Sequence, residues 1–317
     1  MAEYTIWIDA PLSEEAVSVL AEGLEGHHTL WARDLSHPEA ALQEADIAYG
    51  QPPVTTLRDA RRLRWAHLSS AGYTNYDRDD LKAALRARGA RLTNSSGVFD
   101  EPCAQHALAM MLAGARQLLP AHADQLESHA WNTRRNRAQS YLLQDQTVLL
   151  LGFGAIGRRL AELLAPFGLR ILALRRQRQG DEAVEIIEER QLAHALAEAD
   201  HVVNLLPGSP ATEGFANAAF FAGMKPGARY YNIGRGTTTD QNALIDALTG
   251  GRLELAYLDV TEPEPLPPAH PLWTTPNCFI TPHTAGGHQG ETVRLARHFV
   301  ANFHRFERGE ALADAVV

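Results

Sequence analysis

A short apolar segment that leads into a glycine-rich turn constrains the fold of this chain more than any other feature. Residues 147–151 form the apolar run, and the six residues after it contain three glycines in the pattern G-x-G-x-x-G. The next stretch, Arg158 to Ala165, has a helical pattern. In such a unit Gly152 permits the tight turn, Gly154 lets a phosphate approach the backbone, and Gly157 lets the helix pack on the strand. The segment therefore predicts that a dinucleotide pyrophosphate binds at the helix N-terminus.

Apolar runs alternate with helical patterns along the rest of the chain, which is typical of parallel sheets covered by helices on both faces. Turn-forming residues at 94–97 and a long helical pattern from Pro102 to Leu119 separate two such series. With 317 residues, an α/β protein of two domains is expected. The expected strands are 5–8, 28–31, 47–49, 65–68 and 91–93 in the first series, and 147–151, 170–174, 201–206, 229–233, 255–258 and 278–280 in the second.

The domains are expected to be discontinuous in sequence. We place the first part of one domain at residues 1–98, the dinucleotide-binding domain at 99–284, and a C-terminal segment at 285–317 that returns to the first domain. The last helical pattern supports this return because it has a single apolar stripe, which must be covered. The stripe consists of Val293, Ala296, Val300, Phe303 and Phe306. Periodicity alone leaves open the alternative that this helix covers the second domain.

Composition excludes several classes of function. A net charge of −9 offers no broad basic surface for nucleic acid. Only two cysteines occur, Cys103 and Cys278, so we expect no disulfide framework and no metal site, and a reducing cytoplasmic location. No apolar run reaches the ~18 residues of a membrane-spanning helix, so no membrane association is expected.

Two arginines bear on the choice of dinucleotide. Arg175 and Arg176 follow the second strand of the dinucleotide unit, where an NAD site usually has an acidic residue that accepts from the ribose hydroxyls. A guanidinium there favours a 2′-phosphate. We therefore predict NADPH as the cofactor, with NADH as a weaker alternative. The competing interpretation is a solvated basic loop.

Three reactive side chains follow three strands of the second series. Arg235 lies between two glycines and is suited to bind a carboxylate with two parallel donors, Glu264 lies in a proline-rich loop, and His283 follows Pro282. Each alone has an ordinary structural explanation. Together, at the ligand-binding edge of a dinucleotide fold, they supply the cation, the carboxylate and the proton donor that reduction of a ketone needs. His283 is the expected general acid.

The chain strongly resembles the D-isomer-specific 2-hydroxyacid dehydrogenase family over nearly its whole length. The resemblance implies a Rossmann dinucleotide-binding domain, a smaller flavodoxin-like α/β substrate-binding domain and a homodimer. It also implies reduction of a small 2-keto acid to the (R)-2-hydroxy acid. The matching motifs are Gly152-Phe153-Gly154-Ala155-Ile156-Gly157, Met224-Lys225-Pro226-Gly227-Ala228, Asn232-Ile233-Gly234-Arg235-Gly236, Leu258-Asp259-Val260, Glu264-Pro265-Leu266-Pro267, His270-Pro271-Leu272-Trp273 and Thr281-Pro282-His283-Thr284-Ala285-Gly286.

Carried over position by position, the family implies that Arg235 binds the substrate carboxylate and carbonyl, and that His283 protonates the carbonyl oxygen. Glu264 would hydrogen-bond His283 and favour its protonated form. The backbone of Ala71 and Gly72 would receive the substrate carboxylate. The cofactor would contact Gly152, Gly154, Ala155, Ile156, Gly157, Arg175, Arg176, Pro207, Thr212, Ile233 and Asp259, the last of these at the nicotinamide amide.

Departures from the family pattern sharpen these expectations. Many relatives have glutamate where Gln105 stands and an acidic residue where Arg175 stands, which puts a charged role for position 105 and the use of NAD in doubt. Glu264 argues against the formate dehydrogenases, which have glutamine there. The alternative function is a non-catalytic, dinucleotide-sensing regulatory protein, as in the C-terminal-binding-protein corepressors that resemble this family.

The identity of the 2-keto acid does not follow from any motif. Aromatic side chains expected near the substrate pocket are Tyr73, Tyr76, Trp131 and Trp273. Two further histidines, His106 on the long helical pattern and His270 before a proline, are expected to be structural.

Overall fold

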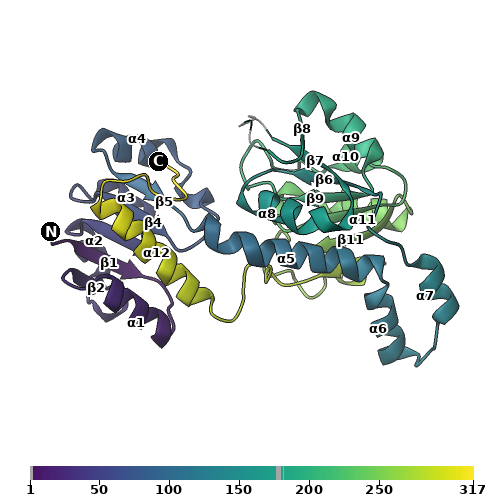
Figure 1. Cartoon of the computed structure of the whole chain (residues 1–317), viewed down its shortest axis with the longest axis horizontal. Coiled ribbons are helices and arrows are strands. Elements are labelled where there is room, and N and C mark those ends of the chain that lie inside the picture. Colours follow the sequence, from purple (N-terminus) through teal and green to yellow (C-terminus); the bar gives the residue numbers. More distant parts are fainter. Residues whose placement is uncertain (1–2, 176–179, 181) are drawn as a thin grey trace. The chain divides into compact units, whose positions relative to one another are not determined.

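The computed structural model describes residues 3–175, 180 and 182–317. It divides into two compact units (Figure 1). The first unit comprises residues 1–99 and 287–317, and the second comprises residues 100–286. Arg176 lies outside the described residues. Within the described parts of the chain, no helix is both long and apolar enough to cross a bilayer.

The first unit is built on a five-stranded parallel sheet in the order β2-β1-β3-β4-β5. This is the flavodoxin-like order, as predicted. Its strands are β1 (Thr5–Asp9), β2 (His28–Trp31), β3 (Ile47–Gly50), β4 (Trp65–Leu68) and β5 (Arg91–Thr93). Its helices are α1 (Glu14–Gly23), α2 (Pro38–Gln43), α3 (Val54–Asp59), α4 (Asp79–Ala87) and α12 (Glu291–Glu307).

The last helix, α12, packs on the first unit through its apolar stripe. Its Phe299 stacks on Tyr49 and Trp65, with ring centroids 4.3 and 5.2 Å apart. Phe299 and Phe303 are fully buried in a core that includes residues of β1, β3 and β4. The stripe is therefore covered by the sheet of the first unit, which is continuous in space although its chain is not continuous in sequence.

The second unit is built on a seven-stranded parallel sheet in the order β12-β11-β10-β9-β6-β7-β8. Its strands are β6 (Thr147–Leu151), β7 (Arg170–Leu174), β8 (Glu185–Ile187), β9 (His201–Asn204), β10 (Ala228–Asn232), β11 (Leu253–Leu258) and β12 (Cys278–Ile280). Its longer helices are α6 (Leu118–Glu127), α7 (Thr133–Gln139), α8 (Ala155–Leu164), α9 (Leu192–Glu198), α10 (Ala218–Gly223) and α11 (Gln241–Thr249), and α5 (Ser96–Ala115) enters from the first unit. The chain order reverses between β6 and β9, which confirms the Rossmann prediction and locates the ligand-binding crevice.

The structure differs from the sequence prediction in its helices. The helical pattern expected from Pro102 to Leu119 is two helices, because α5 begins at Ser96 and the chain breaks at Gln117, where φ is +55°. Pro120, in the first turn of α6, is the sequence signal for this break, and the prediction did not use it. Pro102 lies inside α5, where it removes only one N–H from the helical ladder.

Candidate active site

The glycine-rich turn after β6 has the geometry that a pyrophosphate needs. Gly152 has a φ of +106°, which favours glycine. A Cβ at Gly157 would lie 2.8 Å from the Gly152 carbonyl oxygen, so α8 packs on the strand end only because residue 157 is glycine. A Cβ at Gly154 would meet no atom within 4 Å, which leaves open space beside the exposed N-terminus of α8 at Ala155 and Ile156. This cradle fits a dinucleotide.

The loop after β9 borders the same crevice and is folded on itself. Thr212 donates from Oγ1 to the Pro207 carbonyl at 2.6 Å and accepts from the Ser209 amide at 3.0 Å. Pro207 is exposed and Thr212 half-buried, whereas Ile233, at the end of β10, is buried. The hydroxyl of Thr212 therefore shapes the loop.

Arg175 lies directly after β7 and is partly covered. Its Nη1 donates to Glu182 Oε1 at 3.2 Å, and the two side chains are 19% and 5% exposed. A basic group thus lies where the sequence places it, but beside a buried carboxylate that sequence spacing did not indicate.

Arg235 lies on a loop that is wedged between two others. A Cβ at Gly234 would lie 2.7 Å from the Leu206 carbonyl oxygen, and one at Gly236 would lie 1.9 Å from that of Thr261. The flanking glycines are thus required by their close approach to the loops after β9 and β11. The Arg235 guanidinium donates to the Gly234 carbonyl at 2.6 Å. It donates to no other described residue, so its remaining N–H groups are available to a ligand.

His283 and Glu264 form a hydrogen-bonded pair. His283 Nδ1 lies 2.7 Å from Glu264 Oε2, and Glu264 Oε1 accepts from the Thr261 amide at 3.0 Å. Both carboxylate oxygens are thereby committed, and Glu264 fixes the orientation of the imidazole. Half of the His283 side chain is exposed, at 52%, so its Nε2 is the ring nitrogen available to a substrate.

The backbone at His283 is held in a conformation that a non-glycine residue rarely adopts, with φ at +53°. Asp259 maintains it. The His283 amide donates to the Asp259 carbonyl at 2.8 Å, and the Asp259 carboxylate, 2% exposed, accepts from the amides of Thr284 and Ala285, both at 2.9 Å. The carboxylate also accepts from Thr281 Oγ1 at 2.7 Å. The family resemblance implies that Asp259 contacts the nicotinamide. In the structure its carboxylate instead accepts hydrogen bonds from the loop that carries His283.

His106, expected to be structural, belongs to the same network. Its Nε2 lies 3.1 Å from Thr281 Oγ1 and 3.6 Å from Asp259 Oδ1. Because Thr281 donates its hydroxyl proton to Asp259, His106 is the donor to Thr281. No motif in the sequence indicated this role for His106.

The remaining predicted residues are not all brought to the site. Ala71 and Gly72 follow β4 in the first unit. Tyr76 is buried and donates from its hydroxyl to the Pro52 carbonyl at 2.9 Å, so it supports a loop. Trp131 is 94% exposed on the segment between α6 and α7. His270 accepts from the Leu272 amide through Nδ1 at 3.2 Å and is structural, as expected.

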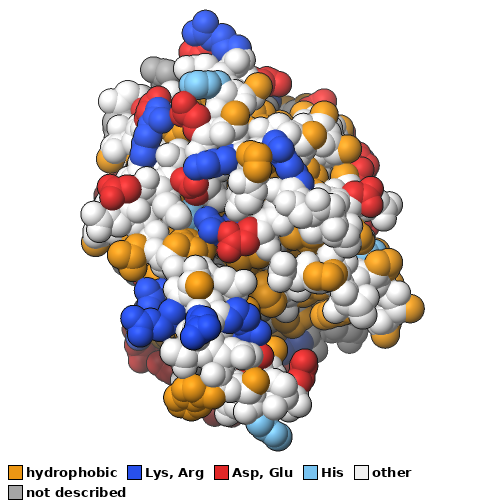
Figure 2. All heavy atoms as spheres, turned by 90° about the vertical axis from the view of Figure 1, so that its right-hand side faces the viewer, with side chains coloured by type: hydrophobic (Ala, Val, Ile, Leu, Met, Phe, Trp, Pro, Cys, Tyr) orange, Lys and Arg blue, Asp and Glu red, His pale blue; other side chains and the backbone are white. Residues whose placement is uncertain are grey.

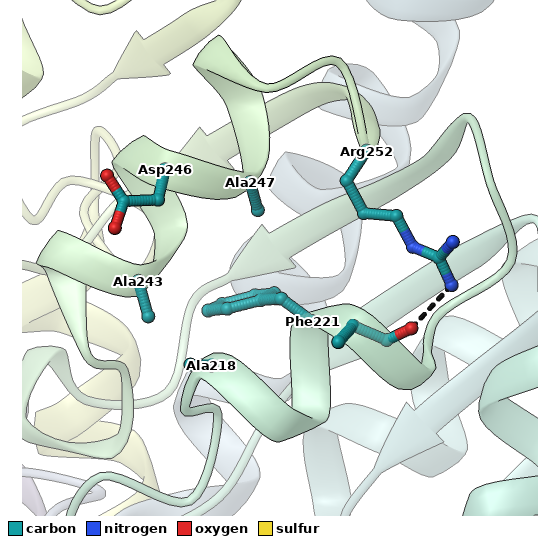
Figure 3. Close-up of a pocket in the computed structure, with 7 residues that line it drawn as sticks. Ala218, Phe221, Ala243, Asp246, Ala247 and Arg252 are labelled. Carbon is teal, nitrogen blue, oxygen red and sulfur yellow. Dashed lines mark hydrogen bonds between the residues drawn. The ribbon is translucent and has the colours of Figure 1, made fainter.

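A cavity of about 260 Å³ between α10 and α11 has no part in this site. Figure 3 shows its alanine-rich wall and Arg252, which donates to the carbonyls of Ala222 and Met224 at the end of α10. Arg252 precedes β11, whereas Asp259 follows it, so the cavity lies at the opposite edge of the sheet. Among the described residues, no group of three or more His, Cys, Asp or Glu side chains is placed to hold a metal ion.

Comparisons with known proteins agree with this geometry. A family model for the "D-isomer specific 2-hydroxyacid dehydrogenase, NAD binding domain" matches residues 108–285. The glyoxylate reductase/hydroxypyruvate reductase of Mus musculus is 33% identical over 97% of this chain and 96% of its own length.

Solved structures with the same fold include two that hold a nicotinamide dinucleotide. A D-isomer specific 2-hydroxyacid dehydrogenase from Xanthobacter autotrophicus, in complex with NADPH and MES, is 28% identical with a TM-score of 0.85, over 100% of this chain and 98% of that one. The NADPH-dependent glyoxylate/hydroxypyruvate reductase of Sinorhizobium meliloti, in complex with NADP and sulfate, is 26% identical with a TM-score of 0.82, over 99% and 98%. The chain therefore belongs to the D-isomer-specific 2-hydroxyacid dehydrogenase family and is an NAD(P)-dependent oxidoreductase.

Proposed function

We propose that this enzyme reduces a small 2-keto acid to the (R)-2-hydroxy acid with NADPH. The observation that carries the proposal is the His283–Glu264 pair, which orients one ring nitrogen toward solvent at the carboxyl edge of the sheet. The loop of Arg235 touches the loop of Glu264 through Gly236 and Thr261. The cation, the carboxylate and the general acid thus follow three successive strands of the sheet, β10, β11 and β12, and together they are the groups that reduction of a keto acid requires.

In the proposed reaction Arg235 binds the substrate carboxylate and carbonyl oxygen with parallel N–H donors. The family resemblance implies that the backbone amides of Ala71 and Gly72 also bind a substrate carboxylate. A nicotinamide dinucleotide held at the glycine-rich turn of Gly152, Gly154 and Gly157 would supply the hydride for C2. His283 gives the proton on Nε2 to the carbonyl oxygen, so one hydride and one proton convert the ketone to the alcohol, and a proton from water restores the imidazolium. Glu264 stabilises the imidazolium through Nδ1.

Glyoxylate and hydroxypyruvate are the first substrates to test, because the relatives from mouse and Sinorhizobium meliloti have these names. A panel of about a dozen 2-keto acids is offered to the purified full chain with NADPH, and the chirality of the product is measured for those that yield a stereocentre. We expect oxidation of NADPH with at least one small 2-keto acid and an (R) product. Binding of NADPH without turnover of any acid would instead support a dinucleotide sensor.

Arg175 supports the preference for NADPH. Its guanidinium lies after β7, where it would donate to a 2′-phosphate, and the adjacent Glu182 would oppose that phosphate. Arg175 should strengthen binding of the 2′-phosphate and Glu182 should weaken it, so each side chain can be tested separately. Two of the solved relatives hold NADPH or NADP.

The test compares kcat/KM for NADPH and NADH in three proteins. We expect the wild type to favour NADPH about tenfold to a hundredfold, as charge-assisted hydrogen bonds predict. The Arg175→Ala, Arg176→Ala double variant should lose most of this ratio, and Glu182→Gln should increase it. Equal use of both cofactors by the wild type, or an unchanged ratio in the double variant, would contradict the proposal.

We also propose that the enzyme is a homodimer that associates through the arm, meaning residues 118–142 with α6 and α7. The arm stands away from the sheet of the second unit (Figure 1). Among the described residues it holds four of the five exposed large apolar side chains, Leu118, Leu126, Trp131 and Leu142. Figure 2 shows this side of the molecule, with hydrophobic surface beside a group of basic side chains.

Charge supports a second copy as the partner of the arm. The arm contains three arginines and two acidic residues, whereas the whole chain has a net charge of −9. A positively charged, apolar arm therefore complements the acidic remainder of an identical chain.

A further inference from the structure

A buried asparagine holds the loop that follows β4 in the first unit. Asn94, 4% exposed, comes directly after β5. Its Nδ2 donates to the Ala71 carbonyl oxygen at 2.7 Å, and its Oδ1 accepts from the Ser96 amide at the start of α5 at 3.2 Å. Both ends of the side-chain amide are therefore used, and they link the 69–72 loop to the first turn of α5.

The backbone of Asn94 is anchored as well. Its amide donates to the Asp314 carbonyl at 3.0 Å, and the Asp314 carboxylate accepts from the Gly97 amide at 2.8 Å. His298 Nε2 of α12 lies 3.1 Å from the same carboxylate. The C-terminal segment thus fixes the position from which Asn94 reaches the loop.

The hydrogen bond to Ala71 determines where the next amide points. A peptide group is planar and trans, so the Gly72 N–H is directed opposite to the Ala71 carbonyl. Because that carbonyl points to Asn94, the Gly72 N–H points away from it. Neither the Ala71 amide nor the Gly72 amide donates a hydrogen bond to any described residue of the chain. The loop therefore presents an oriented donor that protein contacts leave unused.

Side chains of the loop hold the following peptide in the same way. Ser70 Oγ donates to the Gly72 carbonyl at 2.7 Å and accepts from Gln51 Nε2 at 3.1 Å, and Gln51 also reaches Ser69 Oγ at 3.1 Å. The loops after β3, β4 and β5 are thereby joined at the carboxyl edge of the first sheet, where parallel α/β folds bind ligands.

We propose that Asn94 is a positioning residue for the substrate carboxylate. It holds the Ala71 carbonyl inward and so aims the Gly72 N–H at a bound carboxylate without touching the substrate itself. This inference rests on the proposed function, because the carboxylate is that of a 2-keto acid. It assigns to Asn94 an effect on substrate affinity and not on proton transfer.

The decisive variant is Asn94→Asp, because it separates loop positioning from helix capping. Aspartate is nearly isosteric and still accepts from the Ser96 amide, since it is a preferred helix cap, but it cannot donate to the Ala71 carbonyl. We expect KM for the 2-keto acid to rise about tenfold or more. The kcat should change less than threefold, and KM for NADPH should not change. Asn94→Ala should likewise raise KM for the keto acid and change kcat much less.

Asp46→Ala is the matched control. Asp46 is also a buried polar residue of the first unit, but it directly precedes β3, at the opposite edge of the sheet from the 69–72 loop, and its carboxylate accepts from the Thr5 amide at 2.8 Å and from Arg62 Nε at 3.0 Å. Its loss should lower thermal stability and leave KM for the keto acid unchanged. Inhibition by oxamate, a small anion with one carboxylate, provides an independent readout and should weaken in the Asn94 variants alone.

The outcomes separate the two proposals. If the wild type turns over no 2-keto acid, the proposed function fails. If the wild type is active and folded Asn94→Asp has a normal KM and normal oxamate inhibition, Asn94 only caps α5, and the inference is overturned while the function stands. An equal rise of KM in Asp46→Ala would also overturn it, because the effect would then follow from lost stability.

Discussion

His283 has one ring nitrogen engaged by the protein and the other available to a substrate. Glu264 accepts a hydrogen bond from His283 Nδ1, and the buried Asp259 holds the strained backbone of the loop. A residue kept in the left-handed region costs roughly 1 to 3 kcal/mol, so the surrounding contacts must outweigh it. We therefore expect that the orientation of the His283 side chain matters for the reaction.

Replacing His283 by alanine should lower kcat for keto acid reduction by roughly 10² to 10⁴, because the general acid is lost. The dissociation constant of NADPH, measured by fluorescence titration, should stay nearly unchanged. His270→Ala is the control, since that ring only caps a short turn of the same unit. Near-normal turnover in folded His283→Ala enzyme would remove His283 from the proposed mechanism.

Arg235→Lys should lower kcat/KM for the keto acid by about tenfold or more, although the charge is retained. An ammonium group cannot offer two parallel donors to a carboxylate and a carbonyl. Arg190→Lys, at a side chain that is 80% exposed, is the control and should have no effect. If only KM for the dinucleotide rose, Arg235 would belong to the cofactor site.

At the scale of elements, the strands could be predicted and some contacts between loops could not. A continuous apolar run identified β6, because a strand that is buried on both faces leaves few alternatives. β8 was not predicted, because its two apolar residues, Ile186 and Ile187, stand between glutamates at 185 and 188. The glycines beside Arg235 were found, but their reason is contact with Leu206 and Thr261, which are distant in sequence. Contacts of this kind also explain why His106 and Asn94 escaped sequence reasoning.

β4 and β5 enclose a histidine whose protonation state follows from its partners. Ser95 Oγ donates to the Leu68 carbonyl at 2.7 Å, so it accepts from His67 Nε2 at 3.1 Å. His67 Nδ1 must then accept from the Thr93 hydroxyl at 2.6 Å. The ring is neutral and fully buried, and this burial lowers the pKa of His67 to about 3. His201 in the second unit is alike, and burial lowers its pKa also to about 3.

The free energy of unfolding should therefore fall as the pH decreases from about 6.5 toward 3. In that window the unfolded chain binds protons at His67 and His201 that the folded chain excludes. Each histidine contributes a slope of about 1.4 kcal/mol per pH unit. Urea titrations at pH 7, 6 and 5 should show the fall, and His67→Gln should have a shallower slope than the wild type. His28→Gln, at an exposed position, should keep the wild-type slope, and equal slopes in all three proteins would contradict the assignment.

At the scale of the whole molecule, sequence alone predicted two parallel α/β units and the residues at the edge of the second sheet. The strand orders of the two sheets came from the family resemblance, which implied a flavodoxin-like and a Rossmann domain. The arm was not predicted. Its helices lack the continuous apolar stripe of a buried helix, and none of their residues is fully buried.

The arm gives a direct test of the proposed homodimer. Sedimentation velocity of the wild type should show a species of twice the 34.8 kDa chain mass. A Leu126→Asp, Trp131→Asp double variant places two charges on the exposed apolar surface and should shift the protein to a monomer at micromolar concentration, because buried unpaired charges are costly. Trp273→Asp, at the exposed tryptophan outside the arm, is the control and should remain dimeric. A monomeric wild type would refute the dimer, and a double variant that stays dimeric would place the interface on another surface.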